Sequence, residues 1–395
     1  MLFSIGEKIQ EGEKHGWLRR GSPMYKEEIS MIQIGLLMAS FFVSGAGLYY
    51  HGYLLQTVNY NPFAPLFSGA VIALIPTVLA SLICAKFPRD NIIGIARQLL
   101  GRPVGILITA PLVFIHFALP LPIFRIAAEL ITDVHLTNTP PIVLMLILLT
   151  ISSWIALMGT EVVTRTNDEH LVIIFPLTAI MFFLSTSDID PNLARPLTQF
   201  DFSYWMRPEF YGSLSVFFGF GLALFLNDAI SHSQKLYRIL IGLTFLGLLY
   251  LLVTLYLIIG TLGMEMASSF DQPLKVKMTT LREMVFFQRV DILLILLWMF
   301  PTITAMSGLI VTGARAVGQW LHLENYRTVV LAYFITALAL RSSVEPFQNA
   351  RNFLMYLSPL WGGLMTLLLL LFLILSVMKK RYALSQKEPR RRNNG

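Results

Sequence analysis

The sequence has 395 residues, of which 55% are hydrophobic and only 13% are charged, whereas an ordinary soluble domain has about 25% charged residues. This number of charged residues is too small to cover a water-facing surface. The composition therefore excludes an ordinary soluble enzyme and predicts a membrane protein. The net charge of +7 does not indicate a nucleic-acid partner, because the basic residues lie in loops and tails without interleaved aromatic residues. A lone cysteine, Cys84, provides neither a disulfide nor a cysteine metal site.

The first 28 residues are polar and contain no pattern of a cleavable signal peptide. After them come ten apolar stretches of the length that a helix needs to cross a bilayer: residues 29–55, 66–85, 103–133, 142–158, 171–187, 211–227, 239–264, 292–314, 328–341 and 353–378. We therefore predict an all-α polytopic membrane domain over residues 29–378, an N-terminal segment over 1–28 and a basic tail over 379–395.

Spans one and six are each interrupted near the centre by small residues. The interruption in span one is Ser44, Gly45, Ala46 and Gly47, and the interruption in span six is Gly219, Phe220 and Gly221. Matched breaks in two halves of five spans predict a 5+5 inverted-repeat transporter fold with broken helices 1 and 6 and a ligand at their unwound centres. Glycine also allows membrane helices to pack closely, so either break alone is equally compatible with a packing contact.

An unwound helix has free backbone groups that can bind a ligand. The amides of residues 45–47 would favour a carboxylate, with the hydroxyl of Ser44 beside them, and the carbonyls of residues 218–220 would accept hydrogen bonds from an ammonium group. Together they suit a zwitterion such as an amino acid. Phe217 and Phe220 form either an apolar wall of this site or ordinary core.

Span three carries polar residues inside the membrane, where ionisable groups are functional candidates. Arg125, Glu129 and Asp133 recur at i, i+4 and i+8 and so share a helical face. Arg125 and Glu129 are predicted to be a gating pair or a structural ion pair. His116 lies nearer the middle of the span and is either a hydrogen-bonding core residue or a ligand contact.

Span eight contains Thr302, Thr304 and Ser307 after a proline. Hydroxyls at this place are candidates for a sodium site, although hydroxyls in membrane helices commonly bond their own backbone. No His, Cys or carboxylate set has metal-ligand spacing, and no cofactor is expected. The loop over residues 273–288 predicts an amphipathic helix that caps the outer entrance, contacts a partner or lies on the bilayer.

Orientation follows from the basic residues, because cytoplasmic loops are enriched in Lys and Arg. Most of the 30 Lys and Arg residues lie in the two tails and in the connections on the same side as the tails. With ten spans both termini share a side, so both are expected to be cytoplasmic. We found no nucleotide-binding glycine loop and no Gly-x-Ser-x-Gly elbow, and an enzyme is not expected.

The stretch VFFQRVDILLILLWMF, with Arg289, Asp291 and Trp298, resembles span eight of the GerAB family, the B subunits of GerA-type spore germinant receptors. The first helix, ISMIQIGLLMASFFVSGAG, resembles that of the wider amino acid-polyamine-organocation superfamily. The resemblance implies a LeuT-like fold, the inner membrane of a bacterial spore, a germinant such as an amino acid or nucleoside, and partner A and C subunits. An amino-acid permease and a purely structural membrane scaffold are the alternatives. The first break departs from the family pattern, so the ligand class is not carried over.

Overall fold

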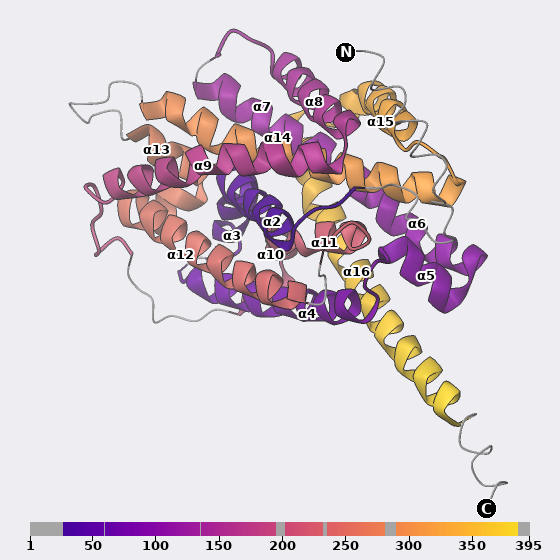
Figure 1. Ribbon diagram of the computed structural model, residues 1–395. Coiled ribbons are helices and arrows are strands. Elements are labelled where there is room, and N and C mark those ends of the chain that lie inside the picture. Colours follow the sequence, from indigo (N-terminus) through magenta and orange to yellow (C-terminus); the bar gives the residue numbers. More distant parts are fainter. Residues whose placement is uncertain are drawn as a thin grey trace, which may run out of the picture.

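The computed structural model describes residues 27–58, 60–134, 136–194, 202–231, 235–280 and 290–385. These residues are helical apart from turns and one isolated bridge, in which Ile29 pairs with Ile230. Figure 1 shows α2 (Met31–Gly45) and α11 (Phe220–Leu226) in the middle of the bundle, surrounded by longer helices. The two segments predicted to be broken are therefore the central ones.

All ten predicted spans are helical where they are described. Span one consists of α2, the π-helix η1 (Ala46–Tyr50) and α3 (His51–Leu55); the others are α4 (Phe63–Lys86), α6 with α7 (Arg102–Ala118, Pro120–Val134), α8 (Pro141–Met158), α9 (Thr160–Leu184), α10 with η3 and α11 (Pro208–Ser213, Leu214–Phe217, Phe220–Leu226), α12 (Leu236–Ser268), α14 (Val290–Leu321), α15 (Arg327–Leu340) and α16 (Phe347–Ser385). Shorter helices in the connections are α5 (Ile92–Leu100), η2 (Ser203–Met206), α13 (Pro273–Thr280) and η6 (Arg341–Ser343).

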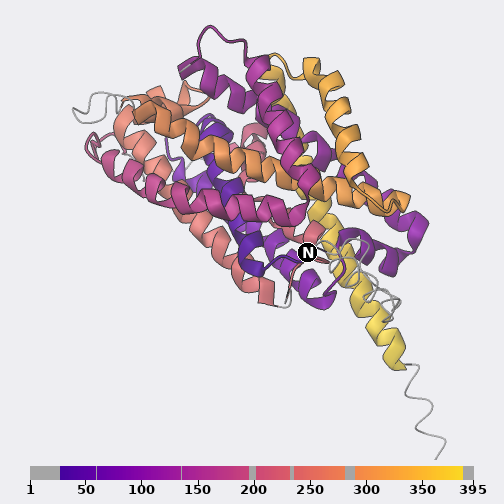
Figure 2. The same ribbon diagram turned by 45° about the horizontal axis from the view of Figure 1, so that its top comes forward.

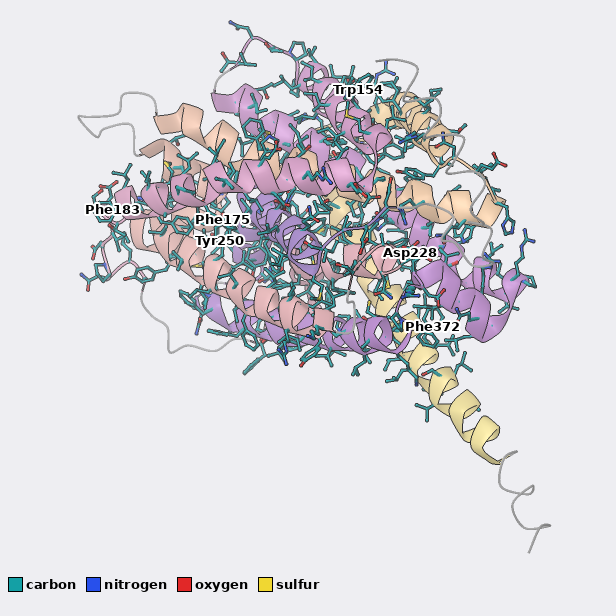
Figure 3. The ribbon with its side chains drawn as sticks, in the orientation of Figure 1. Trp154, Phe175, Phe183, Asp228, Tyr250 and Phe372 are labelled. Atoms are coloured by element: carbon teal, nitrogen blue, oxygen red, sulfur yellow. The ribbon has the colours of Figure 1, made fainter. Side chains whose placement is uncertain are left out.

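By length and composition, eight helices of the described residues can cross a membrane, or nine when the bent pair in span six is counted. The remaining predicted span, the ninth, is α15, which has 14 residues and is only about 21 Å long at 1.5 Å per residue. The outer surface of the bundle is apolar. Trp154 is 61% exposed and Phe183 is 77% exposed, and Figure 3 shows both side chains at the periphery.

Two span boundaries are wrong in the prediction for the same reason. The fifth span, α9, begins at Thr160 rather than near residue 171, and the eighth, α14, continues to Leu321 rather than ending near residue 314. Polar residues in these extensions face the interior instead of water, because Asn167 and Arg315 are wholly buried and bonded to other helices. A buried polar group with partners does not have to end a membrane helix.

The predicted unwinding of span one is also wrong. Ser30 caps α2 with a capping box to Gln33, and the helix then passes without a break into η1, where the Ala46 amide donates to the carbonyls of Phe42 and Val43. A π-turn adds a residue to the helix while its backbone groups stay paired, and such turns occur frequently at functional sites. Span six is broken as predicted: its two parts are bent by 52°.

The start of span one and the end of α16 lie on one side of the bundle, which we call the terminal face. The amide of Ile29 donates to Ala229 at 2.9 Å, Asn227 Nδ2 donates to the Phe87 carbonyl at 2.9 Å, and Lys86 Nζ donates to Ser376 Oγ at 2.6 Å. Figure 2 shows α16 extending beyond the other helices on this face. The opposite side, where α3, α7 and α13 meet, is called the opposite face.

The glycine in the π-turn generates the first prediction. A Cβ at Gly47 would lie 2.5 Å from Cδ1 of Trp298, whereas a Cβ at Gly242 meets nothing within 4 Å. Overpacking a buried contact costs about 1–3 kcal/mol, so Gly47→Ala should lower the melting temperature of the purified protein and Gly242→Ala should not. Equal melting temperatures would show that Gly47 is not a packing contact.

Candidate functional site

A small cavity lies beside the π-turn of span one and the break in span six. It is lined by residues from five spans, among them Tyr49 of η1, His116 of α6, Ser215 of η3, and Ser358 and Trp361 of α16. The cavity is narrow and has room for about one water molecule. A larger ligand would require the surrounding helices to move apart.

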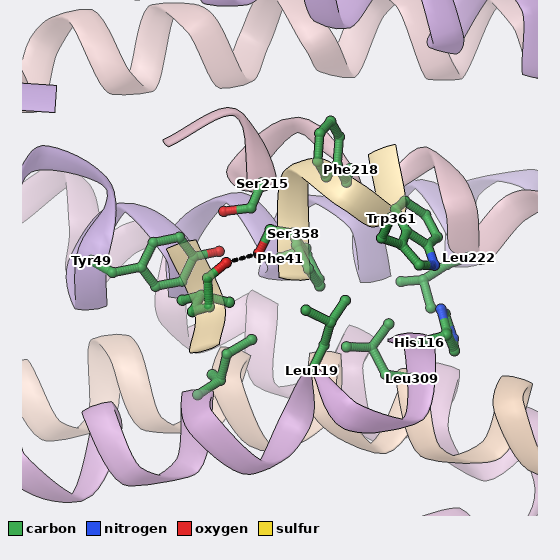
Figure 4. Close-up of a pocket in the computed structure, with 12 residues that line it drawn as sticks. Phe41, Tyr49, His116, Leu119, Ser215, Phe218, Leu222, Leu309, Ser358 and Trp361 are labelled. Atoms are coloured by element: carbon green, nitrogen blue, oxygen red, sulfur yellow. Dashed lines mark hydrogen bonds between the residues drawn. The ribbon is translucent and has the colours of Figure 1, made fainter. Parts of the chain in front are cut away.

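One end of the cavity carries hydroxyl groups. Figure 4 shows the hydroxyls of Tyr49 and Ser215 pointing toward one another, with Ser358 next to them. Ser358 donates to the Leu354 carbonyl at 2.6 Å, and Ser215 donates to the Gly212 carbonyl at 2.7 Å. A hydroxyl oxygen that donates its hydrogen keeps its acceptor capacity, so this end can accept hydrogen bonds from a ligand.

The other end carries two aromatic nitrogens. His116 stacks on Phe225 with ring centroids 4.3 Å apart, and its centroid lies 5.9 Å from the ring of Trp361. His116 Nε2 is 2.7 Å from Thr312 Oγ1. Within the described part of the chain, His116 Nδ1 and Trp361 Nε1 are buried without a hydrogen-bond partner. Buried polar atoms are nearly always paired, so this end is suited to a polar ligand.

Of the residues predicted to bind a ligand, His116 lines this cavity. The glycines mostly support packing: a Cβ at Gly221 would lie 2.1 Å from the Trp361 ring and one at Gly45 would lie 2.8 Å from Val216, while Gly219 is next to Met38 at 3.5 Å. Ala46 is buried in the π-turn.

The aromatic residues at the second break form an apolar cluster. Phe217 packs against Phe42 with centroids 5.5 Å apart, and Phe220 packs against Phe218 and Trp361. Sequence reasoning missed Tyr49, Ser215, Ser358 and Trp361 as lining residues. Tyr49 directly follows the first break and Ser215 precedes the second, but nothing in the apolar run of span ten distinguishes Ser358.

The hydroxyls of the predicted ion site, Thr302 and Thr304, bond Ser44 and Asn167. Ser44 Oγ and Thr302 Oγ1 are 2.7 Å apart. Asn167 Oδ1 accepts from Ser40 at 2.6 Å and from Thr304 at 2.7 Å, while Ser307 bonds its own helix. This polar junction connects α2, α9 and α14. Among the residues with described positions, no group of three His, Cys, Asp or Glu could hold a metal ion.

The opposite face is closed over the cavity by charged groups. Arg351 of α16 bonds Asp271, ahead of α13, and Gln56, at the end of α3. The Tyr53 hydroxyl donates to the backbone carbonyl of Arg351 at 2.7 Å. The three residues Arg351, Asp271 and Gln56, which we call the opposite-face cluster, connect span one to span ten and to the loop that precedes α13.

Next to this cluster, Arg125 Nη1 pairs with Glu129 Oε2 at 2.5 Å, and Arg125 Nε donates to the Glu345 carbonyl at 2.6 Å. Asp133 pairs with Lys275 of α13 at 2.8 Å instead of extending the row on span three.

The predicted amphipathic loop is helical from Pro273 to Thr280, and residues 281–289, including Arg289, lie outside the described residues. Within this helix Lys277 is buried, as is Met278. The ammonium group of Lys277 lies 3.7 Å from Asp188, and burial lowers its pKa while Asp188 raises it. The carboxylate of Asp188 therefore stabilises the buried ammonium group of Lys277.

The terminal face is closed by a second cluster around Arg315, whose side chain is 1% exposed. Its Nη1 donates to Glu27 at 2.7 Å and its Nη2 donates to Asp228 at 3.0 Å. The Tyr326 hydroxyl also donates to Glu27, at 2.7 Å. Burial raises the pKa of Asp228, whereas Arg315 acts to lower it. The terminal-face cluster of Arg315, Glu27, Asp228 and Tyr326 joins the segment before α2, the end of span six, and α14.

Comparisons with known proteins agree with this architecture. The family described as spore germination protein matches residues 28–349. A solved structure of MhsT in complex with L-phenylalanine has a TM-score of 0.63 and 14% sequence identity, over 87% of this chain and 98% of that one. Mhp1, a nucleobase-cation-symport-1 family transporter with bromovinylhydantoin bound, has a TM-score of 0.56 and 13% identity, over 80% of this chain and 72% of that one. No curated protein matches the sequence.

At these identities the two transporters show the fold alone. It is the LeuT-like fold that the matched interruptions and the resemblance of span eight predicted. A shared fold does not imply a shared ligand. The ligand of this chain therefore follows from the residues that line its own cavity.

The terminal-face cluster generates the second prediction. Arg315→Met should leave Glu27 and Asp228 without their buried cation, which typically costs about 3–5 kcal/mol. Arg165→Met is the matched control, because Arg165 is 70% exposed and its ion pair with Glu161 is 3.6 Å long, a type of contact worth about 0–1 kcal/mol. Thermal unfolding of the purified variants checks this. A stable Arg315→Met protein would contradict a bracing role for Arg315.

Proposed function

Because the chain belongs to the family of spore germination proteins, we propose that it is the germinant-sensing membrane subunit of a spore germination receptor. Its ligand is a small polar nutrient, with amino acids as the first class to test, and the ligand binds in the cavity beside the π-turn of span one and the break in span six. The observation that carries the proposal is the pair of unpartnered buried nitrogens, of His116 and Trp361, at the end of a cavity that hydroxyls line at its other end.

The closure of the cavity on both faces supports sensing. A ligand from the opposite face enters when the contacts of Arg351 with Asp271 and Gln56 open. Arg125 braces or gates the same route together with Glu129, since Arg125 ties α7 to the segment before α16 and Glu129 holds its guanidinium. The terminal-face cluster then stays closed beneath the ligand, and binding changes the relative positions of spans one, six and ten without letting the ligand pass.

The resemblance to receptor B subunits extends the proposal to partners and location. The chain works with A and C subunits in the inner membrane of a spore, and both termini are cytoplasmic. Support for the orientation is the concentration of basic residues on the terminal face, including Lys86, Arg89 and Arg97. The ligand therefore enters from the side away from the spore core.

An amino-acid permease of the same superfamily is the second candidate, favoured by the transporter fold of MhsT and Mhp1. The two functions differ in one observable. A permease carries its ligand across the bilayer, whereas a sensor binds it without net transport. A sodium-coupled permease would also need Thr302 and Thr304 to exchange their contacts with Ser44 and Asn167 for an ion.

The third prediction separates these functions and locates the site. Ser358→Leu should fill the cavity and abolish binding of whichever amino acid shifts the melting temperature of the wild-type protein, since a ligand that binds the native state stabilises it. Thr150→Leu is the matched control: both hydroxyls donate to the carbonyl four residues earlier, Ser358 at 2.6 Å and Thr150 at 2.7 Å, but Thr150 is exposed on α8.

The wild-type protein in liposomes should bind the labelled amino acid without accumulating it inside. Accumulation that Ser358→Leu abolishes would establish the permease. Binding that survives in Ser358→Leu would place the site elsewhere.

The fourth prediction concerns orientation. In a Cys84→Ala background, a cysteine at the exposed position Asn192 on the opposite face should react with an impermeant maleimide in intact cells. A cysteine at the exposed position Glu324 on the terminal face should react only after the membrane is opened. The reverse pattern would place the termini outside and overturn the proposed direction of ligand entry.

A further inference from the structure

The cavity offers a ligand no ionised partner. None of the 12 residues that line it in the described part of the chain is Asp, Glu, Lys or Arg. The amides predicted to hold a carboxylate in span one are not free either, because the helix continues through the π-turn and the Ala46 amide is bonded. Burying an ionised group without a partner is far costlier than burying a neutral polar group, so the lining favours an uncharged ligand.

The hydrogen-bonding pattern at the aromatic end follows from Thr312. Its hydroxyl has one hydrogen, which it donates to the Gly308 carbonyl at 2.6 Å. At 2.7 Å from His116 Nε2, the Thr312 oxygen therefore accepts, and Nε2 carries the ring hydrogen. In a neutral imidazole the other nitrogen is then a bare acceptor. His116 Nδ1 accepts, while the neighbouring Trp361 Nε1 can only donate.

An acceptor beside a donor matches a ligand edge on which an N–H group adjoins a C=O group. The walls between the two ends are apolar or aromatic, with Phe218, Leu119, Leu222 and Leu309 around the cavity. Aromatic rings pack well against such walls. At the far end, the hydroxyls of Tyr49, Ser215 and Ser358 can bond a second polar group on the same molecule.

We infer that the cavity binds an uncharged flat heterocycle with an amide edge, as in a nucleobase, with His116 Nδ1 accepting from its N–H and Trp361 Nε1 donating to its C=O. The inference rests on the proposed function and replaces its first ligand class, the amino acids, by another. His116 and Trp361 are then the residues that determine specificity.

The test measures equilibrium binding of uracil, hypoxanthine, 1,3-dimethyluracil and L-alanine to the purified full-length protein. Uracil and hypoxanthine should bind, and L-alanine should not. Dimethyluracil keeps both carbonyls but has no N–H, so its affinity should be at least about tenfold lower. Trp361→Phe, which removes one donor, should weaken uracil binding roughly three- to tenfold. Trp320→Phe is the matched control, since its Nε1 is also buried without a partner among the described residues but lies away from the cavity.

Each outcome decides the inference. L-alanine binding that Ser358→Leu abolishes, with no heterocycle bound, overturns it and leaves the proposed sensor intact. Equal affinities for uracil and dimethyluracil, or an unchanged affinity in a folded Trp361→Phe protein, also overturn it. If Trp361→Phe does not fold, the comparison of uracil with dimethyluracil on the wild-type protein decides alone. A protein that binds none of the four probes contradicts the inference, while the Ser358→Leu experiment still tests the sensor with other amino acids.

Discussion

The buried guanidinium of Arg315 is the interaction on which the rest of the arrangement depends. A charge in the interior of a membrane protein is tolerable only when it is paired, and Arg315 finds its partners in Glu27 and Asp228 on two other segments. Pairing therefore requires the segment before span one, the end of span six and α14 to meet at one point. This fixes the terminal ends of the two interrupted spans, and with them the position of the cavity between their centres.

The two faces of the bundle are closed in different ways, which gives the protein a direction. The cation of the terminal-face cluster is wholly buried, whereas in the opposite-face cluster Arg351 is 13% exposed and Asp271 is 41% exposed at the side chain. Water can solvate the second cluster when it separates, so opening there costs less free energy. The ligand route we propose uses this difference, because the opposite face opens while the terminal face stays braced.

Much of the fold followed from the sequence. Apolar runs located the ten spans, and small residues located the interruptions in spans one and six. What the sequence could not decide was the form of each interruption. Gly45 and Gly47 are compatible with unwinding, but the indole of Trp298, remote in sequence, packs against Gly47 and the helix continues as a π-turn. Polar residues caused the other errors: Asn167 and Arg315 resemble loop residues until their tertiary partners are known.

The site was less predictable than the fold, since Ser358 and Trp361 lie in the uniform apolar run of span ten and become significant only beside His116. The central claim is that the ligand binds among these residues. An experimental structure of the protein with its bound ligand tests this most directly. Ligand density should lie between Ser358 and the rings of His116 and Trp361, in a widened cavity with the Arg315 contacts intact. Ligand density at another place, with this cavity unchanged, would contradict it.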